Sequence, residues 1–216
     1  MPLAKPDHTA RMRPARPGIS IGHYQVTAGT FGAMVYDQKT KVPLILSNNH
    51  VLANASSGRD GRAKRGDAVL QPGAYDRGDQ DDVIGRLYRY VPIRKRVSNL
   101  VDCAVAEPLS PDLVTPEILE IGAVAGTAVA ELGMKLKKSG RTTGLTRGEV
   151  LAVNSSVKVE YPFGIAEFAD QIVAGPMSQG GDSGSLVVDE KNRAVGLLFA
   201  GSEKTTVFSP IQYVLQ

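Results

Sequence analysis

The chain has 216 residues, with 25 Lys and Arg against 22 Asp and Glu, and 42% of its residues are hydrophobic. These values are ordinary for a globular protein and exclude collagen, a coiled coil and a disulfide-stabilised scaffold. Aromatic residues make up only 6% and include no Trp, which leaves little material for an RNA-stacking surface. The 23 Gly and 13 Pro favour turn-rich β structure.

The cysteine content and the lack of long apolar segments bear on the compartment. Cys103 is the only cysteine, so it has no partner for an intrachain disulfide, which fits a reducing environment. No stretch approaches the roughly 18 apolar residues of a membrane span, and the N-terminal region lacks the apolar core of a signal peptide. We therefore expect a cytoplasmic protein, or a secreted one if a signal was removed, and no membrane partner.

Residues 1–17 are basic and contain four prolines. Such a segment is typical of a flexible, solvated arm, and it can also bind nucleic acid or an acidic membrane. We favour the flexible arm and expect no nucleic-acid partner. The basic residues are Lys5, Arg11, Arg13 and Arg16.

Short apolar runs of strand length recur from Gly18 onward between turn residues. This pattern predicts an all-β barrel or sandwich, and closed barrels would leave no exposed strand edges. Helical periodicity is confined to a short turn near residues 116–120 and to the end of the chain. The predicted strands include residues 32–36, 42–46, 83–91, 100–106, 149–153, 171–173, 185–188 and 194–199.

One strand–turn–strand pattern occurs twice in the chain. Residues 34–46 align without gaps with residues 186–198, which suggests two related β units. The proline-rich residues 108–116 form the natural connection between them. We therefore predict an N-terminal β-barrel at residues 18–115 and a C-terminal β-barrel at residues 116–216.

The strongest chemical signal is Gly-Gly-Asp-Ser-Gly at residues 180–184, just before an apolar strand. A nucleophilic serine requires a tight turn, which glycines permit, and backbone N–H groups directed at the oxygen that becomes negative. Ser183 is the candidate nucleophile, and the N–H groups of Gly181 and Ser183 are candidates for an oxyanion hole. The alternative is an ordinary glycine-rich hairpin turn.

A serine hydroxyl needs a base, and the chain contains three histidines. His8 lies in the predicted arm, and His23 has no pattern of polar partners and is expected to be structural or exposed. His50 follows the apolar strand at residues 42–46, so its imidazole is expected at a strand end, facing a cleft.

An imidazole base is oriented by an acid, and Asp102 is the candidate because apolar residues flank it on both sides. Burying a carboxylate costs free energy unless it is paired, and His50 is an available partner. The alternative is a structural Asp bonded to backbone amides. Other aspartates nearby lie in polar surroundings and are expected in solvated turns, namely Asp60, Asp67, Asp76, Asp79, Asp81, Asp82 and Asp112.

The order His50, Asp102, Ser183 is that of chymotrypsin-type enzymes and differs from the orders in subtilisin-type enzymes and α/β-hydrolases. The motifs that accompany these residues occupy positions 46–53, 101–104, 138–144, 180–184, 196–202 and 208–211. On these motifs the chain resembles a chymotrypsin-fold (trypsin-like) serine protease from about residue 18 to its end. It is most similar to streptogrisin-type bacterial peptidases and to the peptidase domain of the plant Narrow Leaf proteins and their bacterial relatives.

This resemblance implies two six-stranded antiparallel β-barrels with the active site in the cleft between them. Peptide bonds would be hydrolysed through an acyl-enzyme, with Ser183 attacking and His50 acting first as base and then as acid. Asp102 would hold the imidazole, and the N–H groups of Gly181 and Ser183 would bind the oxyanion.

The resemblance also implies which residues contact the substrate. The strand with Phe199, Ala200 and Gly201 would pair with the substrate backbone. Met177, six residues before Ser183, would form the base of the specificity pocket. Because Met stands where trypsin-like enzymes carry Asp, we predict an apolar or small residue before the cleaved bond.

The chain departs from the family pattern at several positions. Ser185 replaces a frequent glycine, and Phe199 stands where relatives usually carry a serine that supports the triad carboxylate, so how that carboxylate is held stays open. The chain lacks an Ile-Val-Gly-Gly-like N-terminus, so Asp182 needs another cation. The streptogrisin-like pattern offers Lys138 or Arg141, and we hypothesise that this pair keeps the oxyanion loop formed.

Two further features receive the simpler interpretation. The acidic residues 79–82 could bind Ca²⁺ but are expected to be a surface loop. Cys103 is expected to be a small packed side chain. We predict no metal and no cofactor.

Two functions remain in competition at this point. The first is a serine endopeptidase, and the second is a weak or inactive protease-fold module that binds extended peptides in its cleft. The intact His50, Asp102 and Ser183 favour the first, because a pure binder needs no base opposite a serine. The expected partner is a peptide or protein substrate, and the assembly state cannot be read from the sequence.

Overall fold

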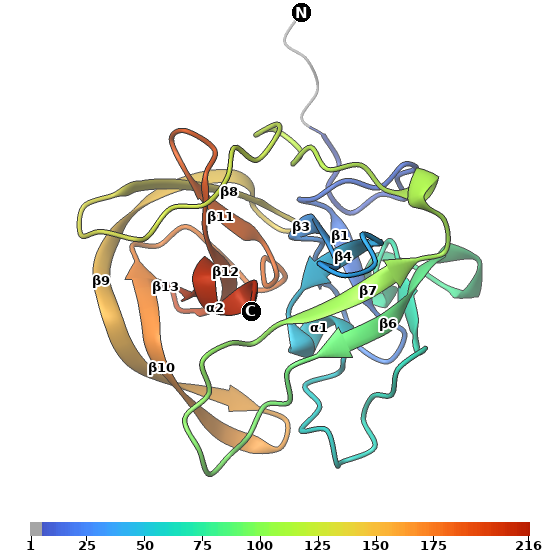
Figure 1. Ribbon diagram of the computed structural model, residues 1–216, viewed down its shortest axis with the longest axis horizontal. Helices are drawn as coiled ribbons and strands as arrows, with labels where there is room; N and C mark the ends of the chain where they lie inside the picture. The colour runs from blue at the N-terminus through green and yellow to red at the C-terminus, as the bar shows by residue number, and fades with distance from the viewer. Residues whose placement is uncertain (1–5) are drawn as a thin grey trace, which may run out of the picture.

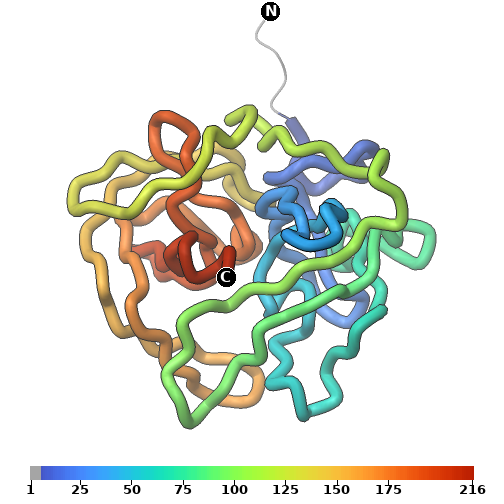
Figure 2. The backbone as a smooth tube through the Cα atoms, viewed as in Figure 1, coloured from blue at the N-terminus to red at the C-terminus, as the bar shows by residue number. Residues whose placement is uncertain are grey.

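The computed structural model describes residues 6–216, and Figure 1 shows their strands gathered in two groups that lie side by side. Lys5 and the other residues before Pro6 lie outside the described part of the chain. The first group of strands comes from the N-terminal half and the second from the C-terminal half, as Figure 2 shows by colour. The predicted all-β, two-barrel fold is confirmed, with one difference in the first half.

The N-terminal half forms one antiparallel sheet of seven strands within the described residues. Its order is β2-β1-β5-β6-β7-β4-β3. The strands are β1 (Ser20–His23), β2 (Gly29–Thr30), β3 (Ala33–Tyr36), β4 (Pro43–Ser47), β5 (Ala68–Leu70), β6 (Val83–Tyr90) and β7 (Ala104–Pro108).

This sheet is rolled up rather than built as the predicted six-stranded barrel. Its edge strands β2 and β3 are separated only by Phe31 and Gly32. The Phe31 N–H donates to the Ile19 carbonyl at 2.9 Å, and the Gly32 N–H donates to the Leu46 carbonyl at 2.9 Å. A single continuous segment therefore bonds to both ends of the sheet, which leaves little edge exposed.

The C-terminal half forms a closed antiparallel barrel with the order β10-β13-β12-β11-β8-β9. Closure pairs every strand on both sides, as predicted for this unit. The strands are β8 (Lys135–Gly140), β9 (Gly144–Tyr161), β10 (Gly164–Ala174), β11 (Leu186–Asp189), β12 (Ala194–Gly201) and β13 (Thr206–Pro210).

Helices are short in the part of the chain that the structure describes. The predicted C-terminal helix is present as α2 (Ile211–Val214), whereas residues 118–122 form a tight non-helical turn where a helical one was expected. None of the helices has the length and apolar character that a membrane span requires. The others are α1 (Asn49–Leu52) and the 3₁₀ helices η1 (Ala74–Asp76), η2 (Gln80–Asp82) and η3 (Pro111–Leu113).

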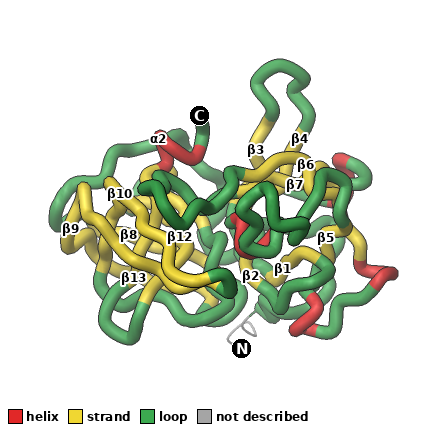
Figure 3. The backbone as a smooth tube through the Cα atoms, turned by 90° about the horizontal axis from the view of Figure 1, so that it is seen from below, coloured by secondary structure: helices red, strands yellow, loops and turns green. Residues whose placement is uncertain are grey.

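The repeated strand–turn–strand pattern corresponds to two β-hairpins, β3–β4 and β11–β12. Val35 pairs with Leu44 in the first hairpin, and Val187 pairs with Gly196 in the second. The gapless sequence alignment superimposes these two pairs. The two halves therefore repeat the hairpin with the same register at these pairs, although a shift follows Val187 in the second. Figure 3 shows the β3–β4 turn projecting from the molecule.

Apolar side chains fill each half and the seam between them. One cluster lies within the N-terminal sheet around Phe31, and another lies within the C-terminal barrel around Phe208. A third cluster joins residues of both halves, including Leu46, Val101 and Leu197. Burial of this shared cluster holds the halves together, so side chains at the seam have defined positions.

The prediction of a flexible arm is wrong for residues 6–17. His8 and Ala15 are buried, and Ala15 bridges to Val114 with its N–H donating to the Leu113 carbonyl at 2.7 Å. The small Ala15 side chain fits into the N-terminal core, and burial of this kind outweighs the loss of chain freedom. The segment is thus part of the fold, and the connection between the halves, predicted at 108–116, runs on to β8 without a further strand.

We predict that Ala15→Asp lowers the free energy of unfolding by about 3 kcal/mol or more, because it buries a carboxylate without a partner. The measurement is denaturant unfolding. Arg11→Ala, which removes the exposed ion pair with Asp82, serves as the control and should change stability by less than about 1 kcal/mol. Equal effects of both substitutions would mean that residues 6–17 are not integrated into the core.

Candidate active site

His50 and Asp102 form a close pair at the seam between the two halves. His50 Nδ1 lies 2.6 Å from Asp102 Oδ2, and the His50 backbone N–H donates to Asp102 Oδ1 at 3.2 Å. The Asp102 side chain is fully buried, whereas 24% of the His50 side chain is exposed. With its proton on Nδ1 and directed at the carboxylate, the imidazole keeps Nε2 available to accept a proton.

The sequence around His50 explains how this pair is held. His50 lies in α1, whose first N–H groups have no partner within the helix, and Asp102 accepts one of them. The Asn48 side chain donates to the Asp102 carbonyl at 2.7 Å. The Asn49 side chain donates to the Val91 carbonyl at 2.6 Å. This bond holds the start of the segment that runs from the end of β6 to Asp102. The two asparagines before the histidine therefore set its geometry.

Tyr161, the last residue of β9, supplies a third partner for Asp102. Its hydroxyl donates to Asp102 Oδ2 at 2.8 Å, and its ring meets the His50 ring edge-on at a centroid distance of 6.1 Å. Burial, together with the charge of Asp102, raises the pKa of Tyr161, so the hydroxyl stays protonated and donates.

Sequence reasoning missed Tyr161. The signal was indirect: Phe199 removes the expected hydroxyl, so a buried carboxylate needed a donor from elsewhere. Phe199 packs instead against Phe168 at a centroid distance of 4.7 Å, in a cluster that also contains Tyr161. Nothing in the sequence indicated which residue would replace the donor, because Tyr161 comes from the other half of the fold.

The loop that carries Ser183 is attached to the N-terminal half through Thr30 of β2. The Thr30 N–H donates to the Ser183 carbonyl at 2.7 Å, and its hydroxyl donates to the Gly181 carbonyl at 2.9 Å. A Cβ at Gly29 would lie 2.4 Å from a methyl group of Val51 and 2.9 Å from the Ser183 carbonyl. Only glycine fits there, between the neighbour of His50 and the loop of Ser183.

The structure therefore brings Ser183 to the same seam as the His50–Asp102 pair. Among the hydrogen bonds of residues 6–216, none joins the Ser183 hydroxyl to the imidazole. Catalytic hydrogen bonds are often long or poorly aligned when no substrate is bound.

The N–H groups of Gly181 and Ser183 have no protein acceptor within residues 6–216, whereas those of Asp182 and Gly184 do. The Gly180 carbonyl accepts from the Thr142 hydroxyl at 2.7 Å. Because the C=O and N–H of a trans peptide point in opposite directions, this bond directs the Gly181 N–H away from Thr142. Two free N–H groups on one tight loop can stabilise an oxyanion.

The Ser183 N–H is oriented in the same way, because it shares a peptide plane with the Asp182 carbonyl. That carbonyl accepts from the Ser185 N–H and hydroxyl at 3.0 and 2.6 Å. Ser185, the departure from the family pattern, thus supports the loop. Gly181 adopts φ +97°, and a Cβ there would lie 2.3 Å from the Thr142 hydroxyl oxygen. Glycine is therefore required at position 181 by both conformation and space.

Asp182 is fully buried, and its side chain anchors the loop that carries Ser183. Its carboxylate lies 3.2 Å from Lys138 Nζ, and Lys138 is also fully buried. The Thr143 hydroxyl donates to Asp182 at 2.7 Å, and the Gln179 N–H donates at 2.9 Å. Burial lowers the pKa of Lys138, and the charge of Asp182 opposes this effect.

Arg141, the other cation proposed for Asp182, pairs with Asp76 instead. Its Nε donates to Asp76 Oδ2 at 2.8 Å, and its guanidinium lies over the Tyr75 ring at 4.9 Å. The guanidinium also donates to the Thr142 hydroxyl at 3.0 Å, and the side chain lies beside Gly181, where a Cβ would be 3.0 Å from its Nη1. The physical reason is that Asp76, whose side chain is largely buried beside β1, offers both carboxylate oxygens to the planar guanidinium.

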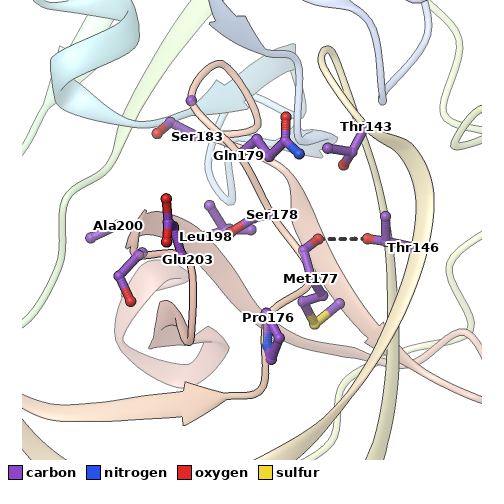
Figure 4. A pocket seen from close by; sticks show the side chains of 13 residues that line it. Thr143, Thr146, Pro176, Met177, Ser178, Gln179, Ser183, Leu198, Ala200 and Glu203 are labelled. Atoms are coloured by element: carbon purple, nitrogen blue, oxygen red, sulfur yellow. Dashed lines mark hydrogen bonds between the residues drawn. The ribbon is translucent and has the colours of Figure 1, made fainter.

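A cavity of about 780 Å³ opens beside Ser183, and Figure 4 shows the side chains around it. Ala200 and Gly201 line it. Met177 also lines it, but its side chain is 3% exposed and packs into the barrel core, where a Cβ at Gly148 would lie 2.6 Å from its sulfur. The Phe199 side chain does not line the cavity.

Several polar side chains outside the candidate site have structural roles. His23 is buried and lies 3.2 Å from Asp67, and burial lowers its pKa although Asp67 opposes this. The prediction of solvated turns is wrong for Asp67 and Asp76, because both side chains are largely buried, Asp67 beside His23 and Asp76 beside Arg141. The acidic residues 79–82 cap η2, and within the described residues no three metal-ligating side chains gather.

The Cys103 thiol is buried beside Asp102, as expected for a packed side chain. Burial, followed by the charge of Asp102, raises its pKa to about 12. The thiol therefore stays protonated at neutral pH, and it makes a poor nucleophile.

No protein-family model and no curated protein sequence matches the chain. Solved structures do match it along most of its length. A Nocardiopsis protease (NAPase) is 20% identical with a TM-score of 0.64, and Thermobifida fusca protease A is 21% identical with a TM-score of 0.64; each match covers 93% of this chain and 95% of the other. A Cellulomonas bogoriensis chymotrypsin is 22% identical with a TM-score of 0.62, covering 93% of both chains. The chain therefore has the chymotrypsin fold.

We predict that Lys138→Met lowers the free energy of unfolding by about 3–5 kcal/mol, because Asp182 would remain as a buried charge without its cation. Denaturant unfolding measures this. Lys135→Met is the matched control on the same strand: it removes an exposed pair with Glu149 and should cost less than about 1 kcal/mol. A loss for Lys138→Met no larger than for the control would contradict the role assigned to the buried pair.

Proposed function

We propose that the protein is a serine endopeptidase that hydrolyses peptide bonds through an acyl-enzyme. The observation that carries this proposal is the His50–Asp102 pair, with Nδ1 and Oδ2 at 2.6 Å, on the same seam as Ser183 and the N–H groups of Gly181 and Ser183, which have no acceptor within residues 6–216. The fold adds support, because the structures that resemble this chain are named as proteases.

Each step of the reaction has a group to perform it. His50 Nε2 accepts the proton of the Ser183 hydroxyl as the oxygen attacks the peptide carbonyl. The carbonyl oxygen becomes negative and is stabilised by the N–H groups of Gly181 and Ser183. His50 then gives its proton to the leaving amine, and a water molecule, activated in the same way, releases the acyl group.

Asp102 makes these proton transfers easier. Its buried carboxylate keeps the proton on Nδ1, orients the ring and stabilises the imidazolium while it exists. Tyr161 keeps the carboxylate in place, and its hydroxyl is the donor that Phe199 cannot supply. The proposal therefore assigns Tyr161 a positioning role.

The preference for an apolar or small residue before the cleaved bond also belongs to the proposal. Met177, which lines the cavity, offers no charge to pair with Lys or Arg, and Leu198 and Ala200 add apolar lining. Glu203, the acidic residue at the cavity, is exposed and therefore well solvated. Digestion of a peptide library should yield cleavage mostly after apolar or small residues, and predominant cleavage after Lys or Arg would overturn this preference.

The first test is labelling with a fluorophosphonate, which reacts with activated serines. We expect labelling of the wild type and of Ser202→Ala, whose hydroxyl also lines the cavity, and none of Ser183→Ala. His50→Ala should label at least about 10³-fold more slowly, because the base is lost.

Persistent labelling of Ser183→Ala would contradict the assignment of Ser183 as the nucleophile. Absence of labelling in the wild type, together with binding of peptides in the cleft, would favour the alternative of an inactive peptide-binding module.

The second test concerns Tyr161. Tyr161→Phe keeps the ring but removes the hydroxyl, and we expect kcat to fall about tenfold to a hundredfold with little change in KM, since a hydrogen bond to a charged group contributes about 1.5–3 kcal/mol. Tyr36→Phe, which removes a hydroxyl from an exposed tyrosine on β3, is the control and should leave both constants unchanged. A Tyr161→Phe enzyme with wild-type kcat would show that Asp102 does not depend on this donor.

A further inference from the structure

A second cavity, of about 640 Å³, lies beside the proposed catalytic seam and has a strongly basic lining. Four cations line it, against a single carboxylate from Asp60. The cations are Arg62, Arg94, Lys95 and Arg96. No part of the proposed reaction uses them.

Three of these cations are available to a ligand. Arg94, Lys95 and Arg96 are exposed, and within residues 6–216 none of them forms an ion pair with a carboxylate. Lys95 Nζ lies 5.7 Å from the centre of the Phe163 ring, which keeps it over the cavity wall. Three adjacent like charges repel one another, so an anion between them would be bound favourably.

Asp60 offsets only one of the four positive charges of the cavity, and its carboxylate is engaged by its own loop, beside Arg62. Its oxygens accept from the Ser57 N–H at 2.8 Å, the Ser56 hydroxyl at 2.9 Å and the Arg62 N–H at 3.2 Å. Burial opposes ionisation of Asp60, but these hydrogen bonds prevail and lower its pKa to about 2. The Arg62 guanidinium lies 3.9 Å away, at the limit of an ion pair.

The segment that carries the three cations has a fixed backbone. Asn99 is buried, accepts from the Arg94 N–H at 2.9 Å and donates to the Arg94 carbonyl at 2.8 Å. Its side chain also donates to the Glu167 carbonyl of β10 at 2.9 Å. Figures 1 and 2 show this loop beside the end of the β9–β10 hairpin. The cations are therefore presented on a preorganised frame, which lowers the entropic cost of binding.

The cavity is linked to the catalytic residues by a short row of aromatic rings. Phe163, in the cavity wall, stacks on Tyr161 at a centroid distance of 5.4 Å, and Tyr161 meets His50 at 6.1 Å. Ile93, also in the wall, belongs to the same apolar cluster as Phe199. The cavity thus lies on the side of the strand that is proposed to pair with the substrate backbone. An extended peptide advances about 3.3 Å per residue, so a few residues span this row.

We propose that this basic cavity binds acidic side chains of the substrate, two to four residues before the cleaved bond. This inference rests on the proposed function and adds a second determinant of specificity to the first pocket. An apolar or small residue enters the pocket beside Ser183, while Asp or Glu upstream meets Arg94, Lys95 and Arg96.

A nucleic acid is the other polyanion that a basic cavity could attract, and the observations favour a peptide. Phe163 is the aromatic residue in the cavity wall, and one of its faces is already covered by Tyr161 while Lys95 lies over the ring. No ring is therefore free to stack on a base, which single-stranded nucleic acids require. The adjacent catalytic seam requires an extended peptide in any case.

The test uses three peptides that are identical except at the second, third and fourth residues before the cleaved bond, which are all Glu, all Gln or all Lys. We expect kcat/KM for the Glu peptide to exceed that for the Gln peptide about fivefold to tenfold at low salt, with the Lys peptide slowest. The advantage should shrink as salt rises, because screening weakens exposed charge pairs. In the triple variant Arg94→Gln, Lys95→Gln and Arg96→Gln, the Glu to Gln ratio should fall to about one.

A matched triple variant controls for net charge. Lys39→Gln, Lys41→Gln and Lys191→Gln remove three exposed cations from turns outside the cavity and should keep the wild-type ratio. A Glu peptide cleaved no faster than the Gln peptide, or a preference that survives in the Arg94, Lys95 and Arg96 variant, would overturn the inference.

Fluorophosphonate labelling separates this failure from failure of the proposed function. An enzyme that labels and cleaves the Gln peptide without favouring Glu refutes the cavity inference alone. If labelling and cleavage both fail, fluorescence anisotropy measures binding of the same peptides to the wild type. Equal affinity for the Glu and Gln peptides would then overturn the cavity inference. Tighter binding of a single-stranded oligonucleotide than of the Glu peptide would overturn the choice of a peptide.

Discussion

The buried carboxylate of Asp102 is the constraint on which the rest of the structure depends. Removing a charge from water costs several kcal/mol unless polar partners replace the solvent. Asp102 has three such contacts: the imidazole and the backbone N–H of His50, and the hydroxyl of Tyr161. The first two come from the N-terminal half and the third from the C-terminal barrel. Satisfying one charge therefore fixes how the two halves meet.

A second buried charge does the same for the loop of Ser183. Asp182 is surrounded by Lys138, by the Thr143 hydroxyl and by backbone N–H groups, all from the C-terminal barrel. Thr30 then attaches this loop to the N-terminal half through two hydrogen bonds. The peptide planes at Gly181 and Ser183 are oriented as a result, since their neighbouring carbonyls are already bonded. The proposed oxyanion hole thus needs no newly cut N-terminus to form it.

Two further sets of contacts surround the loop that holds Asp182, and one of them comes from the N-terminal segment. Arg141 lies between Asp76 and Thr142, which links a turn of the first half to the loop that holds Asp182. His8 lies 2.9 Å from Glu120, and Glu120 also accepts from the Leu145 N–H on the strand that follows this loop. Residues that the sequence suggested were a solvated tail therefore brace the turn beside the site.

The sequence by itself determined the all-β class, the repeated hairpin and the residues around Ser183, because strand periodicity, turn residues and glycine requirements are local properties. It also singled out Asp102, since an acidic residue in an apolar segment is unusual wherever it lies, although Asp102 itself precedes β7 rather than lying in it. Only the tertiary structure decided that Tyr161 holds Asp102, that Arg141 pairs with Asp76, and that residues 6–17 are packed. Each of these depends on contacts between segments far apart in the chain. Such contacts are selected by the competition of several partners for one buried charge or one space, and local patterns carry no information on the outcome.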